Sequence, residues 1–181
     1  MTRKVKTMKQ NILYSKEKIE EKVKELGLTI SSDYQNEDKN LLIISLLKGS
    51  FIFTADLVRH ITVPVRIEFM ETSSYGFGKE STGKVEIVSG LTMDISDYDV
   101  LIVDDILDSG HTMKTVYDFL KKRNPKSMKT CAFLDKPSRR QVDMDVDYKG
   151  FVIEDKFIAG YGLNYGHHYR NTPYIFEVVE N

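Results

Sequence analysis

The chain has 181 residues, of which 41% are hydrophobic and 29% charged, and its formal net charge is −1. This composition is typical of a globular protein, and the length suits one domain over residues 1–181. The small net charge and the pI of 6.4 argue against a nucleic-acid-binding surface. No apolar run approaches the ~20 residues that a membrane-spanning helix requires.

Cys131 is the only cysteine, so no intramolecular disulfide can form. Its apolar neighbours favour a buried thiol in a reducing compartment, and we expect a cytoplasmic protein. The first ten residues, MTRKVKTMKQ, are basic but lack the hydrophobic segment and cleavage site of a targeting peptide. We expect them to form a terminus that is frayed or draped over the surface.

The first predicted element is an amphipathic helix over residues 11–27. Ser15 is its candidate N-cap, and apolar residues recur at helical spacing from Ile19 onward. Gly27 is expected to end the helix, because glycine is common just past a helix C-terminus.

Apolar runs and helical patterns alternate along the rest of the chain. Helices are predicted over residues 51–61 and 112–123, and strands over residues 41–47, 65–71, 85–90, 100–104 and 128–134. Shorter strand-like runs follow at residues 151–153, 157–161 and 174–179. The alternation predicts an α/β fold with a doubly wound, mainly parallel sheet flanked by helices and ligands at the carboxyl ends of its strands.

The most informative segment is VLIVDDILDSGHT at residues 100–112. A buried strand ends in Asp104 and Asp105, and a polar turn then leads into a helix. The helix N-terminus offers unpaired N–H groups to a phosphate, while the two carboxylates can accept hydrogen bonds from a vicinal diol. Phosphate and diol together indicate a ribose 5-phosphate, although the turn alone would also fit a simple helix cap.

The complete string resembles the phosphoribosyl diphosphate signature of type I phosphoribosyltransferases, whose acidic pair is usually Glu-Asp. Asp104 is therefore one methylene shorter than the usual residue. From about residue 41 to residue 170 the chain resembles the hypoxanthine-guanine phosphoribosyltransferases. The resemblance implies that the central sheet carries a mobile lid loop and a small hood subdomain from the C-terminal part.

The same resemblance implies a role in purine salvage. Family members transfer 5-phosphoribosyl from phosphoribosyl diphosphate to N9 of hypoxanthine or guanine, with Mg²⁺ assistance, and yield IMP or GMP and pyrophosphate. They are usually dimers or tetramers, so a homo-oligomer without nucleic-acid or membrane partners is expected.

The resemblance implies that two loops of the chain bind the diphosphate and close the site. Leu47, Lys48 and Gly49 would form the pyrophosphate loop, which contains a non-proline cis peptide in the family. Ser74 and Tyr75 would belong to a lid within residues 71–84 that excludes water from the reacting ribose. By themselves these segments would fit an ordinary turn and a hairpin tip.

The signature residues receive distinct roles from the resemblance. Asp104 and Asp105 would contact the ribose diol and the Mg²⁺ shell, and Asp108 would accept a proton beside N7 of the purine. His111 would contribute only its main-chain N–H. The 5-phosphate would be bound by Asp108, Ser109, Gly110, His111 and Thr112.

The base is expected to lie between two later segments. Lys136 would donate to the exocyclic O6, which distinguishes a 6-oxopurine from a 6-aminopurine. Phe157 would stack on the purine, and Ile158 would offer its main chain to the base edge. Lys136 alone would also fit an ordinary surface lysine before proline.

The last segment supplies expected diphosphate and metal contacts. Arg170 would bind pyrophosphate, and Asn164 stands where the family usually has an aspartate near the Mg²⁺ shell. The missing charge predicts weaker metal or pyrophosphate binding rather than lost activity. His167 and His168 would point to opposite faces of a strand and lack a carboxylate or cysteine cluster, so no transition-metal site is expected there.

Two other interpretations stay open. A non-catalytic regulator could retain the phosphoribosyl diphosphate pocket, although a basic face or an added DNA-binding domain would be expected in that case. Alternatively, the enzyme could prefer xanthine, because the sequence does not rank hypoxanthine, guanine and xanthine.

Overall fold

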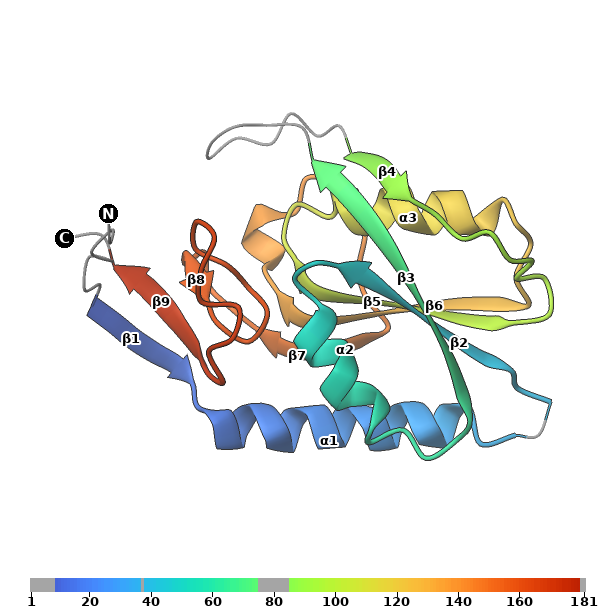
Figure 1. The fold of residues 1–181 in the computed structure, drawn as a ribbon, viewed down its shortest axis with the longest axis horizontal. Coiled ribbons are helices and arrows are strands. Elements are labelled where there is room, and N and C mark those ends of the chain that lie inside the picture. Colours follow the sequence, from blue (N-terminus) through green and yellow to red (C-terminus); the bar gives the residue numbers. More distant parts are fainter. Residues whose placement is uncertain (1–8, 37, 75–84, 180–181) are drawn as a thin grey trace, which may run out of the picture.

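The computed structural model describes residues 9–36, 38–74 and 85–179, arranged as two sheets with helices packed on the larger one (Figure 1). In chain order the elements are β1 (Lys9–Tyr14), α1 (Lys16–Asp33), β2 (Leu41–Leu47), α2 (Phe51–Val58), β3 (Val65–Ser74), β4 (Val85–Ser89), β5 (Asp99–Leu107), α3 (His111–Lys121), β6 (Ser127–Asp135), the 3-10 turn Pro137–Arg139, β7 (Tyr148–Val152), β8 (Ile158–Ala159) and β9 (Ile175–Val179).

The larger sheet has the strand order β4-β3-β2-β5-β6-β7. Its strands pair in parallel except β3 with β4, which are antiparallel. The predicted mainly parallel α/β sheet is therefore confirmed. Helices cover both faces because strands such as β2 are apolar on both sides: Ile43 packs in the cluster with α1 and α2, and Ile44 packs in the cluster with α3.

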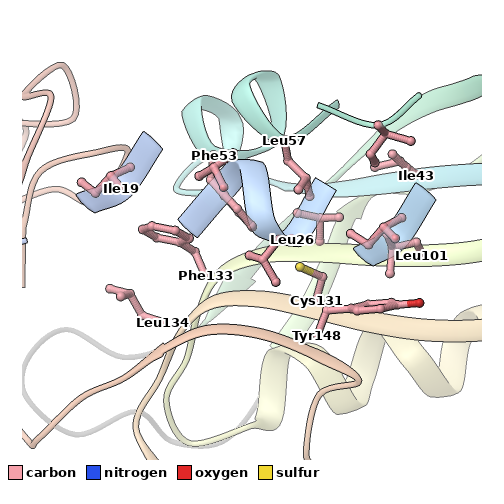
Figure 2. Packing of buried hydrophobic residues seen from close by; sticks show 14 of the residues in the cluster. Ile19, Leu26, Ile43, Phe53, Leu57, Leu101, Cys131, Phe133, Leu134 and Tyr148 are labelled. Carbon is pink, nitrogen blue, oxygen red and sulfur yellow. The ribbon is translucent and has the colours of Figure 1, made fainter. Parts of the chain in front are cut away.

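Aromatic and aliphatic side chains from α1, α2 and the sheet fill the first of these clusters (Figure 2). The rings of Phe53 and Phe133 lie 4.8 Å apart between centroids, and Leu26 packs in the same cluster. Cys131 lies in this core and is fully buried, as its apolar neighbours predict.

A second, three-stranded antiparallel sheet has the order β1-β9-β8. Strands β8 and β9 confirm the expected small C-terminal unit, but its third strand, β1, comes from the start of the chain. The predicted helix at residues 11–14 and the predicted frayed or draped terminus at 9–10 are both wrong, because residues 9–14 pair with β9 along its length. The predicted cap is nevertheless correct, since Ser15 Oγ accepts from the N–H of Lys18 at 3.4 Å.

The predicted end of α1 at Gly27 is also wrong, since the helix continues to Asp33. A Cβ on Gly27 would lie 2.5 Å from the Cβ of His60, just past α2. The glycine is therefore where two chain segments approach closely, and it does not stop the helix. Tyr34 closes the helix by donating its N–H to the carbonyl oxygen of Ile30.

Several predicted boundaries change by a few residues. Helix α2 ends at Val58 instead of 61, and β3 continues to Ser74. The most important change is in β5, which extends to Leu107 because its pairing with β6 continues past the acidic pair. Among the described helices, none combines the length and apolarity needed to cross a bilayer.

Replacing Gly27 by alanine tests the close packing of α1. In a helix interior this change normally adds about 0.5–1 kcal/mol of stability. Because the new methyl group would overlap His60, we expect Gly27→Ala to lower the free energy of unfolding by about 1–3 kcal/mol in urea titrations. Lys24→Ala, on the exposed face of α1, is the control, and a stabilised Gly27→Ala variant would contradict the packing argument.

Candidate active site

A cavity of about 260 Å³ lies where β2 and β5 end and α3 begins. This is the expected edge of a parallel sheet, where ligands meet the carboxyl ends of strands. It is lined by Leu46, Leu47, Gly49, Thr72, Asp104, Asp105, Ile106, Leu107, Asp108, Ser109, Gly110, Thr112 and Met113. The structure thus brings most of the signature together with the predicted pyrophosphate loop.

The two adjacent carboxylates are held in place by neighbouring main-chain amides. Asp104 Oδ1 accepts from the N–H of Asp105 at 2.9 Å, and Asp105 Oδ1 accepts from the N–H of Ile106 at 3.0 Å. Burial raises the pKa of both groups, and the neighbouring charge of Asp105 raises that of Asp104 further. Hydrogen bonds and the positive charge of Arg170 oppose the increase in the pKa of Asp105. A cation or a diol would relieve this clustering of negative charge.

The predicted pyrophosphate loop packs directly on this acidic pair. The peptide bond between Leu47 and Lys48 is cis, as the resemblance implies. A Cβ on Gly49 would overlap Asp105 Oδ2, so only glycine lets the loop approach so closely. The Lys48 side chain is exposed, with its Nζ 3.5 Å from Glu71 Oε1.

The polar turn after β5 forms the N-terminus of α3. Gly110 has φ +89°, a left-handed conformation that glycine adopts without strain, and immediately precedes the helix. Ser109 and Thr112 line the cavity beside it. The ring of His111 is 3.2 Å from Gln141 Oε1, so this side chain already has a partner. The first-turn amides lack acceptors within the helix, which makes the turn a suitable anion site.

The residues expected to contact a base come from the segments after β6 and β7. Lys136 is buried, and its Nζ donates to the carbonyl oxygen of Lys156 at 2.6 Å. Phe157 is exposed, with its ring edge-on to Tyr165 at 5.7 Å between centroids. Ile158 is buried in β8. None of the three lines the cavity itself, so a bound base would extend beyond it.

The loop that carries Arg170 returns to the start of the site. Arg170 Nη1 donates to the carbonyl oxygen of Gly162 at 2.6 Å. Gly162 has φ +100°, and a Cβ there would overlap the carbonyl oxygen of Gly49. This contact joins the two loops and places the guanidinium charge near the acidic pair.

The remaining expected site features are Asn164, the histidine pair and the lid segment. Asn164 is exposed, and its Nδ2 donates to the carbonyl oxygen of Gly166 at 2.6 Å. His167 and His168 lie in a turn in which His168 bridges to Tyr165, so the opposite-face geometry of adjacent strand residues does not apply to them. Ser74 ends β3, whereas Tyr75 and the rest of the expected lid to residue 84 lie outside the described residues.

Two arginines that the sequence does not single out reach back to the signature turn. Arg140 Nη1 donates to the carbonyl oxygens of Leu107, at 3.0 Å, and Asp108, at 2.5 Å, while its Nη2 pairs with buried Asp135. Arg139 Nε lies 3.4 Å from Asp108 Oδ1. Their position just after Lys136 is visible in the sequence, but nothing local shows that they fold back over the turn.

Residues 9–166 match the phosphoribosyl transferase domain family. The chain belongs to this family. A hypoxanthine-guanine phosphoribosyltransferase of Aquifex aeolicus is 47% identical over 176 residues, which cover 97% of this chain and 98% of the relative. A hypoxanthine phosphoribosyltransferase of Salmonella typhimurium is 44% identical over 168 residues, covering 93% and 94% of the two chains.

Solved phosphoribosyl transferase structures confirm the type I fold. A hypoxanthine phosphoribosyltransferase of Staphylococcus aureus superposes with a TM-score of 0.88 at 42% identity, covering 95% of this chain and 92% of that one. A hypoxanthine-guanine phosphoribosyltransferase of Bacillus anthracis, with HEPES in its active site, gives 0.87 at 45% identity and covers 95% and 99%.

The raised pKa of Asp104 predicts a pH-dependent stability difference. Below the unfolded-state pKa of about 3.9, the carboxyl is protonated in both states, so its burial costs little. As pH rises toward the folded-state pKa, ionisation favours the unfolded chain and stability is lost. In EDTA, we expect the Tm of Asp104→Asn to exceed that of the wild type by a margin that grows between pH ~4 and pH ~7. Each kcal/mol of stability difference should raise the Tm by about 2–4 °C.

Scanning calorimetry across this pH range measures the margin directly. Asp97→Asn, an exposed aspartate before β5, serves as the control and should show no growing margin. A pH-independent difference between Asp104→Asn and the wild type would contradict burial as the cause.

Proposed function

We propose that this protein is a hypoxanthine-guanine phosphoribosyltransferase of purine salvage. It transfers 5-phosphoribosyl from phosphoribosyl diphosphate to N9 of hypoxanthine or guanine and forms IMP or GMP and pyrophosphate. The names of the Aquifex aeolicus and Salmonella typhimurium relatives support the substrate class. The proposed assembly is a cytoplasmic homo-oligomer in which residues 1–181 form one domain.

One observation carries the proposal: a single cavity joins an anion site, an acidic pair and the 47–49 loop. The start of α3 suits the 5-phosphate, and Asp104 and Asp105 suit the ribose hydroxyls beside it. The loop with Lys48 and Gly49 lies against Asp105, where the diphosphate leaving group would bind. These three chemistries, at one place, match the parts of phosphoribosyl diphosphate.

The acidic pair also suits Mg²⁺, which binds through one or two carboxylates and water. Two adjacent carboxylates with raised pKa values are the kind of donor set that a divalent cation stabilises. A Mg²⁺ ion held there would supply positive charge to the leaving diphosphate. Asn164 can contribute only a neutral amide oxygen to that shell.

The protein's own groups then act on the ribose and the base. The carboxylates of Asp104 and Asp105 stabilise positive charge that develops at the anomeric carbon. Asp108 accepts the purine proton as N9 attacks, a role worth about 10²–10⁴ in rate. Lys136 donates to O6, and Phe157 covers the purine face. Arg170 holds pyrophosphate.

Replacing Asp108 by asparagine tests its role as the proton acceptor. Asparagine has a similar shape but cannot take up the proton, so we expect turnover to fall at least about tenfold. Binding of phosphoribosyl diphosphate with Mg²⁺, measured by calorimetry, should be retained. Product formation is measured separately with hypoxanthine, guanine, xanthine and adenine. Asp118→Asn, a half-exposed position on α3 that pairs with Lys114, is the matched control.

The results separate the proposed function from its rivals. Wild-type protein that binds phosphoribosyl diphosphate but converts no base would indicate a regulator. Preferred conversion of xanthine would correct the substrate, and full activity in Asp108→Asn would remove Asp108 from the mechanism.

Placing a carboxylate at residue 164 tests whether Asn164 weakens the affinity for Mg²⁺. The added negative charge should strengthen attraction for Mg²⁺, so Asn164→Asp should need about two- to fivefold less Mg²⁺ for half-maximal rate, the range of an exposed charge. Asn36→Asp, in the loop before β2, adds the same charge elsewhere. An unchanged Mg²⁺ requirement in Asn164→Asp would refute this effect.

A further inference from the structure

Four side chains of alternating charge form a chain from the signature turn to the segment before β8. Asp108 Oδ1 lies 3.4 Å from Arg139 Nε, and Arg139 Nη1 lies 3.5 Å from Asp155 Oδ2. Asp155 Oδ1 is in turn 3.9 Å from Lys136 Nζ. Two anions and two cations alternate, so the chain as a whole is neutral.

The two ends of this chain are the groups that the proposed function assigns to the base. Asp108 would meet the purine at N7 and Lys136 at O6, and these atoms are neighbours on one edge of a 6-oxopurine. Both groups must therefore keep a fixed separation for one base to satisfy them together. Arg139 and Asp155 span the gap between them, while a neutral chain suits an uncharged base.

The carboxylate of Asp108 has an unusual environment. Its Oδ1 is covered and accepts no hydrogen bond from the described residues, although the side chain as a whole is 41% exposed. The guanidinium of Arg139 is the cation that lies against this oxygen. Arg140 already holds the main-chain carbonyl of Asp108, so Arg139 is left to orient the side chain.

A stabilising role for the fold explains this arrangement poorly. The side chains of Arg139 and Asp155 are 43% and 52% exposed, and ion pairs with such exposure contribute little to stability. A misplaced proton acceptor, by contrast, reduces the rate of the chemical step directly.

We propose that Arg139 and Asp155 are positioning residues, which hold the proton acceptor Asp108 and the base-reading Lys136 at the spacing of a 6-oxopurine edge. The inference rests on the proposed function. Arg139 acts through Asp108, and Asp155 anchors Arg139 while it also faces Lys136.

The test compares Arg139→Gln, Arg139→Lys, Asp155→Asn and the Arg139→Gln/Asp155→Asn double variant in steady-state assays with hypoxanthine. Arg139→Gln should lower kcat about fivefold, a small part of what a proton acceptor supplies, and leave KM for phosphoribosyl diphosphate and Tm unchanged. Arg139→Lys keeps the positive charge and should recover at least about half of the lost rate. Asp155→Asn should lower kcat less in the Arg139→Gln background than in the wild type, because the two residues act together.

Arg59→Gln is the matched control, since Arg59 is an exposed arginine on α2's C-terminal side that pairs with Asp56. If the wild type turns over and Arg139→Gln equals Arg59→Gln in kcat, the inference is wrong while the proposed function stands. The inference is also overturned if the loss of kcat in Arg139→Gln is accompanied by a matching loss of Tm and Arg139→Lys does not recover it. A wild type that converts no base overturns the proposed function and the inference with it.

Discussion

The contact between the Asp105 carboxylate and the backbone of Gly49 organises the rest of the site. Strands β2 and β5 are parallel neighbours, so their carboxyl ends meet at one edge of the sheet. Asp104 ends up buried there and Asp105 half-buried, and both carboxyl groups have raised pKa values. Uncompensated buried charge lowers stability; the positive charge of Arg170 offsets part of it, and a bound cation would offset more.

A second close backbone contact extends this arrangement to the C-terminal loop. Gly162 packs against the carbonyl oxygen of Gly49, and Arg170 donates to the carbonyl oxygen of Gly162. A charge from far along the sequence is thereby brought near Asp105. Glycine at both positions is a steric requirement, because any Cβ would separate the loops or displace Asp105.

The sequence predicts the central sheet well because its signals are local. The apolar run at 41–47 and the strand-turn-helix pattern at 100–112 each specify their own structure, and their ends do meet at one cavity. Strand β1 was not predictable in this way, since its partner β9 lies at the other end of the chain. Gly27 lies within a helix at a close tertiary contact with His60, which no local pattern reveals. Likewise, ion pairs between separate loops, such as Arg139 with Asp155, leave no periodic pattern in the sequence.

Asp104 and Asn164, the two residues that depart from the pattern implied by the resemblance, offer different groups to a cation. Asp104 has one oxygen occupied by the N–H of Asp105, and its shorter side chain keeps the second close to the strand. Asn164 donates through Nδ2 to Gly166, which leaves its amide oxygen as the acceptor. A neutral acceptor attracts a cation less, but it also repels a diphosphate less. Because Mg²⁺ would enter largely with the diphosphate, these two effects of the missing charge at Asn164 partly cancel, and the carboxylates of Asp104 and Asp105 would supply most of the attraction for the cation.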